Sequence, residues 1–216
     1  MQPVSEINEK DLDNIRRSVT DSLSAPRAAH ILSVERTAER MGRILLPGDV
    51  MRLRAAALLH DITKEYSFTE QCALCRRYDI PLTERPEDIA KTLHARTGAY
   101  VARERFPSIV DREIFLAVYR HTTGDRDMTV FEKIIFLADM IEETRSYPLC
   151  TALRDTFFSG VAEAQTAEER VNILDAVCFK ALSETILMLV KNDRVVADET
   201  VFAYNFLASR QLPVPK

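Results

Sequence analysis

The sequence of 216 residues lacks several features on which other classes of protein depend. It contains no tryptophan, only five glycines and only four cysteines. Scarce glycine together with many long unbranched side chains favours helices, because such side chains lose little rotamer freedom there. An all-β fold is therefore disfavoured. The cysteines are too few and too unevenly spaced for a disulfide framework, and this usage is typical of a reducing cytoplasm. They are Cys72, Cys75, Cys150 and Cys178.

Neither an excess of positive charge nor a long apolar run is present. The 29 Lys and Arg against 33 Asp and Glu give a formal charge of −4, so the chain has no overall basic character of a nucleic-acid binder. A small anionic ligand needs only a local cluster of cations. Apolar runs such as Ile186–Val190 are far below the ~18 residues that span a bilayer, and the first residues lack the pattern of a secretion signal. We expect neither nucleic acid nor a membrane as a partner.

Apolar residues recur at intervals of three and four along most of the chain, which predicts a series of helices and no strand. We expect a first helix around residues 7–22, a second over Pro26–Leu45 that Pro47 and Gly48 end, and a third over about residues 50–62.

Residue pairs with the spacing of a capping box mark the starts of further helices, since a hydroxyl there accepts from a free backbone N–H and a glutamate returns to the cap. These pairs are Ser67 with Glu70, Thr129 with Glu132 and Thr166 with Glu169. We expect Asp111 to cap a helix that reaches Arg120, and Asp198 to cap the last helix. Pro86 is expected in the first turn of a helix, and Gly98 between two short helices.

Four histidines, His30, His60, His94 and His121, are the most informative residues. One histidine on an apolar helix face is more often a satisfied core residue than a ligand. His60, however, directly precedes Asp61 after the apolar residues 55–59, which places an imidazole and a carboxylate at the end of a buried helix. An unpaired carboxylate among apolar neighbours is costly, so it needs a cation, hydrogen bonds or a proton.

Asp139 poses the same problem, because it follows the apolar residues 134–138 and should face inward. A metal ion would compensate both carboxylates. Imidazole nitrogen with carboxylate oxygen suits iron, manganese, cobalt or zinc better than calcium or magnesium. The alternative for Asp139 is a buried salt bridge with an arginine such as Arg145.

The order His, His-Asp, His, His, Asp resembles that of the HD-domain metal-dependent phosphohydrolases, and within them that of the YqeK-type symmetrical bis(5′-nucleosyl)-tetraphosphatases. The sequence departs from this pattern at Ala95, where the family often has glycine, and at Glu143, where it often has proline. The segments that carry the resemblance are Arg27-Ala28-Ala29-His30, Leu58-Leu59-His60-Asp61-Ile62-Thr63-Lys64, Leu93-His94 with Gly98, His121-Thr122-Thr123-Gly124 with Met128, Ala138-Asp139-Met140-Ile141-Glu142 with Arg145, and Thr200 with Ala203-Tyr204-Asn205.

The resemblance implies an all-α fold, an HD-domain helical bundle with the metal site in its core. One ion, expected to be iron with manganese, cobalt or zinc as substitutes, would be bound by His30, His60, Asp61 and Asp139. A second ion would be reached by Asp61 together with His94 and His121. With one ion only, those two histidines would instead donate hydrogen bonds to the substrate phosphates.

The resemblance also implies which residues handle the substrate. Asp61, Lys64, His94 and His121 are the expected catalytic residues. Phosphate oxygens would be held by His94 and His121 and by Arg27, Thr63, Lys64, Thr122 and Arg145, since arginine binds phosphate with two parallel hydrogen bonds and lysine acts as a mobile charge. The nucleoside would contact Thr200, Tyr204 and Asn205.

We expect one structural domain with three parts. Residues 1–24 form an N-terminal helical segment, residues 25–146 the HD-domain catalytic core, and residues 147–216 the C-terminal helices, which pack on the core and close the nucleotide site. The apolar stripe over Val171–Leu189 packs within the chain in the simplest interpretation, and it leaves a homodimer open.

The function implied by the resemblance is metal-dependent hydrolysis of diadenosine tetraphosphate to two ADP by metal-activated water. A dinucleoside polyphosphate or an ADP-like nucleotide is therefore the expected ligand. Two alternatives stay open: another HD-type phosphohydrolase acting on a nucleoside monophosphate or an alarmone, and a nucleotide sensor without catalytic activity.

Overall fold

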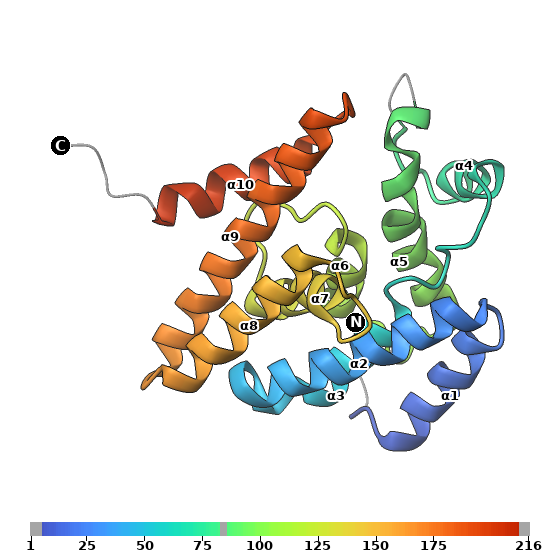
Figure 1. The fold of residues 1–216 in the computed structure, drawn as a ribbon. Helices are drawn as coiled ribbons and strands as arrows, with labels where there is room; N and C mark the ends of the chain where they lie inside the picture. The colour runs from blue at the N-terminus through green and yellow to red at the C-terminus, as the bar shows by residue number, and fades with distance from the viewer. Residues whose placement is uncertain (1–5, 83–85, 212–216) are drawn as a thin grey trace.

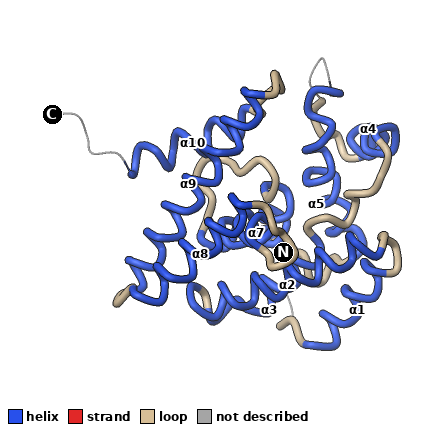
Figure 2. Tube along the Cα trace, in the orientation of Figure 1, coloured by secondary structure: helices blue, strands red, loops and turns tan. Residues whose placement is uncertain are grey.

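The structure, a computed structural model, describes residues 6–82 and 86–211, whose regular elements are all helices joined by loops and turns (Figures 1 and 2). Within those residues no strand is formed, which confirms the predicted all-α class. The α-helices are α1 (Glu9–Thr20), α2 (Ala25–Leu45), α3 (Val50–Leu59), α4 (Phe68–Arg77), α5 (Leu93–Arg105), α6 (Arg112–Arg120), α7 (Val130–Ile141), α8 (Pro148–Glu163), α9 (Ala167–Lys191) and α10 (Asp198–Gln211), and the short 3₁₀ helices are Pro47–Asp49 and Pro86–Thr92.

Several helix starts are where the capping residues predict them. Ser67 and Thr166 both make complete capping boxes, and the Asp111 side chain accepts from the backbone N–H of Ile114. The box predicted at Thr129 is only half formed. Its hydroxyl accepts from the backbone N–H of Glu132, but the Glu132 carboxylate accepts from Arg120 instead of returning to the cap. An ion pair with a neighbouring helix thus replaces the local hydrogen bond.

Three predicted boundaries are wrong. Gly98 does not separate two helices, because α5 runs through it. A Cβ at this position would lie 3.4 Å from Thr63 Oγ1 and 3.6 Å from the carbonyl oxygen of His60, so the glycine permits close packing of α5 on the turn after α3. That turn begins earlier than expected, since α3 ends at Leu59. Asp198 is the first residue of α10 rather than the residue before it.

Helix α7 lies at the centre of the fold, with α8, α9 and α10 on one side and α4 and α5 on the other (Figure 1). It contacts α2, α3, α6, α8 and α9. Its side chains from Phe131 to Ala138 are buried on every face. A helix buried on all faces needs no polar stripe, which explains its nearly continuous apolar sequence.

The C-terminal helices share this core. Helix α9 packs on α7, α8 and α10, and its stripe buries Leu174, Val177, Ala181 and Leu182 within the chain. Near its C-terminal end, Leu187 and Val190 are exposed. No helix of the described residues has the length and apolar character that crossing a membrane requires.

A buried ion pair joins α7 to α9 and generates a stability prediction. Lys133 Nζ lies 2.6 Å from Asp175 Oδ1, and both side chains are buried. We expect Asp175→Ala to lower the free energy of unfolding by about 3–5 kcal/mol, because it leaves the Lys133 charge buried without a partner. Urea denaturation measures the change.

The control for this prediction is Arg43→Ala, which breaks the exposed pair of Arg43 with Glu39 at a separation of 2.6 Å. An exposed pair of this kind contributes about 1 kcal/mol or less. Equal losses in the two variants would contradict a special contribution of the buried pair.

Candidate metal centre

The predicted metal ligands come from five helices and converge in the core. His30 lies on α2, His60 and Asp61 follow α3, and Asp139 lies near the end of α7. His94 lies in the first turn of α5, and His121 directly follows α6. All four histidines and Asp61 are buried, while the Asp139 side chain is 20% exposed.

Two overlapping groups of donor atoms form in this cluster. His30, His60 and Asp139 make one group, and His60, Asp61 and His121 make the other; within each group the ligand atoms lie within 4.8 Å of one another. In the first group, Asp139 Oδ1 lies 3.0 Å from His30 Nε2 and 3.9 Å from His60 Nε2. Such spacing lets a single cation contact three donors.

Asp61 joins the two groups because its oxygens face different neighbours. Its Oδ2 lies 3.5 Å from His60 Nε2 and 3.8 Å from His30 Nε2. Its Oδ1 lies 3.5 Å from His121 Nε2 and 3.2 Å from His94 Nε2. This is the arrangement that a carboxylate bridging two ions requires.

The histidine rings are held by hydrogen bonds at their outer nitrogens. Nδ1 of His60 lies 2.6 Å from the carbonyl oxygen of Ala57, and Nδ1 of His121 lies 2.7 Å from that of Val118. Both histidines follow a helix and bond to the residue three positions back. Because a carbonyl oxygen only accepts, the proton resides on Nδ1, and the lone pair of Nε2 faces the cluster.

His30 is oriented by a carboxylate rather than a carbonyl. Its Nδ1 donates to Glu142 Oε1 over 3.1 Å, from a residue 112 positions away in the chain. Glu142 also accepts from the backbone N–H and the hydroxyl of Thr144, which fixes the carboxylate. Sequence reasoning named Glu142 only as part of a segment that carries the family resemblance and gave it no role. The available signal was its place three residues after Asp139, on the same side of the chain.

The donor set fits a metal ion. Among the buried side-chain atoms of residues 6–82 and 86–211, those without a hydrogen-bond partner include His30 Nε2, His60 Nε2 and Asp61 Oδ1. Buried polar atoms in proteins are nearly always satisfied, so unsatisfied atoms gathered among the candidate ligands indicate a bound cation. Nitrogen and oxygen donors together are the set preferred by iron, manganese, cobalt and zinc.

The cluster attracts positive charge. Burial acts to raise the pKa of Asp61 and of Asp139, but the surrounding histidines hold the pKa of each carboxyl well below its usual range. Burial also acts to lower the pKa of His30, yet its contacts with Asp139 and Glu142 together raise that pKa to about 9. His94 behaves oppositely, because burial lowers its pKa to about 4.

Two arginines pair with these carboxylates. Arg27 Nη1 lies 2.7 Å from Asp61 Oδ2, and Arg145 Nη2 lies 2.7 Å from Asp139 Oδ1. The salt bridge considered as the alternative for Asp139 therefore exists alongside its contacts with the histidines. Each guanidinium has five N–H donors, so most remain available to a further anion.

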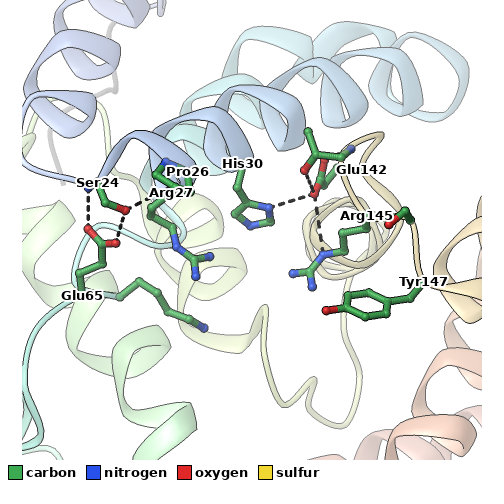
Figure 3. A pocket seen from close by; sticks show the side chains of 11 residues that line it. Ser24, Pro26, Arg27, His30, Glu65, Glu142, Arg145 and Tyr147 are labelled. Carbon is green, nitrogen blue, oxygen red and sulfur yellow. Dashed lines mark hydrogen bonds and ion pairs between the residues drawn. The ribbon is translucent and has the colours of Figure 1, made fainter.

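A pocket of about 610 Å³ opens beside the cluster (Figure 3). Arg27 and Arg145 lie on either side of His30 at its wall (Figure 3). Lys64 also lines the pocket, with its Nζ 3.0 Å from His94 Nε2, and burial lowers the pKa of Lys64. Helix α3 ends at Leu59, and the turn that follows it brings Lys64 to the site.

Thr122 reaches the cluster, whereas Thr63 does not. Thr122 Oγ1 lies 3.0 Å from Nε2 of both His94 and His121. The Thr63 hydroxyl is fully buried and donates to the carbonyl oxygen of His94 over 2.9 Å. This side chain faces α5 and does not line the pocket, and its contact with substrate stays a prediction.

None of the three residues predicted to contact the nucleoside lines the pocket at the metal centre. Thr200 lines a second pocket of about 300 Å³, to which Thr122 also contributes. Tyr204 stacks on Phe179 of α9 at a ring distance of 5.2 Å, and Asn205 is exposed on α10. Neither lines this pocket or the one at the metal centre. Packing within the helical pair α9–α10 accounts for Tyr204.

Gln71 is a further supporting residue that the sequence analysis missed. From α4, its amide donates to the carbonyl oxygen of Thr63 over 2.6 Å, and its oxygen accepts from the Thr97 hydroxyl. Gln71 thereby fixes the turn that carries Asp61 and Lys64 against α5. The only local signal is its place one helical turn before the buried Cys75.

Comparison with known proteins gives consistent results. Residues 27–144 match the HD domain family. A protein from Halalkalibacterium halodurans named symmetrical bis(5′-nucleosyl)-tetraphosphatase is 32% identical to this chain, and the match covers 89% of this chain and 95% of that protein. A protein of the same name from Staphylococcus aureus is 27% identical, and the match covers 91% of this chain and 94% of that protein. A crystal structure from Clostridium acetobutylicum, described as a "predicted HD superfamily hydrolase involved in NAD metabolism", has a TM-score of 0.81 at 26% identity and covers 95% of this chain and 100% of that one.

The orientation of His30 generates a prediction about metal affinity. We expect Glu142→Gln to weaken metal binding roughly 10- to 100-fold, with iron(II) as the probe, because the carboxylate that orients His30 and raises its basicity loses its charge. Competition with an iron(II) chelator under anaerobic conditions measures the affinity. The neighbouring exposed Glu143 provides the control, since Glu143→Gln should leave the affinity unchanged. Unchanged affinity in Glu142→Gln would contradict a role for this carboxylate.

Proposed function

Because the chain belongs to the HD domain family, we propose that it hydrolyses diadenosine tetraphosphate symmetrically, to two ADP. The observation that carries this proposal is the two groups of metal donors that share His60, with Asp61 in contact with histidines of both and cationic side chains beside them. The relatives of this chain that match over about nine tenths of its length are named for this reaction. Their names support the substrate, and the geometry supports the chemistry.

The enzyme depends on a metal, and we propose iron as that metal. His30, His60 and Asp139 would hold one ion, and Asp61 would extend toward a second. When bound, the metal supplies a Lewis acid and a source of nucleophilic water near neutral pH. The protein contributes rings whose tautomers are set by Ala57, Val118 and Glu142 before any ligand arrives.

The cationic residues would bind the phosphate chain. Arg27 and Arg145 are held by Asp61 and Asp139, so their guanidinium groups face the pocket without reorganisation when an anion binds. Lys64 adds a mobile charge next to His94. Together they would place an inner phosphorus of the substrate at the metal centre, and ADP would leave on the far side.

We assign different roles to the two histidines whose function the sequence leaves open. His121 shares a donor group with His60 and Asp61 and is oriented in the same way as His60. His94 Nε2 lies 3.2 Å from both Asp61 Oδ1 and His121 Nε2, but it also lies 3.0 Å from Lys64 Nζ and from Thr122 Oγ1, two groups that are expected to hold phosphate. His121 would therefore ligate the second ion, and His94 would contact phosphate.

The homodimer and the cytoplasmic location stay predictions. The four cysteines are free thiols, which agrees with a reducing compartment. Mass determination in solution tests the oligomeric state.

The reaction itself is tested by product analysis. Protein loaded with iron under anaerobic conditions should convert each diadenosine tetraphosphate to two ADP, separated by chromatography. His60→Ala and Asp139→Ala should both abolish turnover, because each removes a donor from the first group. AMP and ATP as products would contradict the symmetrical cut. Tight binding without turnover in the loaded wild-type protein would indicate a sensor, and turnover of monophosphates or alarmones alone would indicate another HD-type phosphohydrolase.

The roles of the two histidines are tested by metal content. We expect His121→Ala to bind one iron fewer per chain than the wild-type protein, since one donor group loses a ligand. His94→Ala should keep the wild-type metal content and raise KM instead. Elemental analysis after removal of free iron measures the stoichiometry. Loss of metal in His94→Ala with full content in His121→Ala would reverse the assignment.

A further inference from the structure

One aromatic side chain at the metal centre has no role in the chemistry described above. Tyr147 lines the 610 Å³ pocket, and it lies on the same side of His30 as Arg145 (Figure 3). Its side chain is 69% exposed, the highest value among the exposed large hydrophobic residues of residues 6–82 and 86–211. The face of this exposed ring is therefore available to a ligand in the pocket.

The backbone that carries this ring is firmly held. The Tyr147 carbonyl oxygen accepts from the backbone N–H of Thr151 in the first turn of α8, and Pro148 follows with a fixed φ. On the other side, Arg154 donates to the carbonyl oxygens of Ile141 and Arg145, over 2.6 and 2.8 Å. The backbone that presents the ring is thus held in place by these hydrogen bonds, so it needs no ordering when a ligand binds.

The pocket combines this ring with positive charge. Arg27, Lys64 and Arg145 line the same pocket. The Arg145 guanidinium donates to both the backbone oxygen and the carboxylate of Asp139. A volume of about 610 Å³ lies within the range of about 300–1,000 Å³ that is typical of small-molecule sites. A ligand that matches both features has phosphates at one end and a planar ring at the other, as a nucleoside diphosphate has.

We propose that a nucleobase of the substrate stacks on the ring of Tyr147 while Arg145 holds the adjoining phosphates. The inference deepens the proposed function and rests on it. Stacking engages the face of any base, so this contact selects for a planar base without distinguishing adenine from guanine. Tyr147 is accordingly a substrate-binding residue that favours ligands with a nucleoside over polyphosphate alone.

The experiment separates the base from the phosphates. Binding of ADP and of inorganic pyrophosphate to the iron-loaded protein is measured by calorimetry for the wild type, Tyr147→Ala and Tyr147→Phe. We expect Tyr147→Ala to weaken ADP binding roughly 5- to 150-fold and to leave pyrophosphate binding unchanged, because loss of one stacked base has an effect of this size. Tyr147→Phe keeps the ring face and should bind both ligands as the wild type does.

A matched control comes from another exposed aromatic residue. Phe202 is 44% exposed on α10 and does not line this pocket. Phe202→Ala should bind ADP and pyrophosphate with wild-type affinity. In turnover of diadenosine tetraphosphate, Tyr147→Ala should raise KM more than it lowers kcat, since the chemical groups stay in place.

Two results would overturn the stacking. ADP binding that is unchanged in Tyr147→Ala shows that the ring contacts no base, and equal weakening of ADP and pyrophosphate shows that Tyr147 acts only by positioning Arg145. The proposed function fails separately: a wild-type protein that binds ADP through Tyr147 but cleaves no diadenosine tetraphosphate contradicts the reaction and not the stacking.

Discussion

The buried carboxylate of Asp61 is the constraint on which the rest of the site depends. Its side chain is 2% exposed, and the two oxygens face different histidines. A buried negative charge is unfavourable unless cations and hydrogen-bond donors surround it. Arg27, Lys64 and four histidine rings surround this carboxylate, and they form an environment that suits both metal ions and phosphates.

Packing and hydrogen bonds between helices hold the turn that carries Asp61 in place. Gly98 lets α5 approach the turn after α3, and the hydrogen bonds of Thr63 and Gln71 join that turn to α5 and α4. These contacts take no part in the chemistry, yet they set the distance between Asp61 and His94. Placement within about 0.5 Å is what a metal site demands, and rigid helices supply it better than loops do.

Sequence patterns located most elements because the interactions that begin and end helices are local. Caps at Ser67, Asp111 and Thr166 act within three residues, so they could be identified without the fold. Gly98 was misjudged for the same reason: glycine has a low helix propensity in any local calculation, but here the close approach of the turn after α3 outweighs that propensity.

The sequence by itself determined that the chain is all-α and that His60, Asp61 and Asp139 would be polar groups needing compensation at the ends of apolar runs. Only the tertiary structure decided which groups meet them. Thr63 turns to α5 although it neighbours the site in sequence, while Glu142 meets His30 across 112 positions. The physical reason is the distance along the chain over which interactions act. Periodicity and capping depend on residues a few positions apart, whereas the direction of each side chain depends on how helices far apart in sequence pack together.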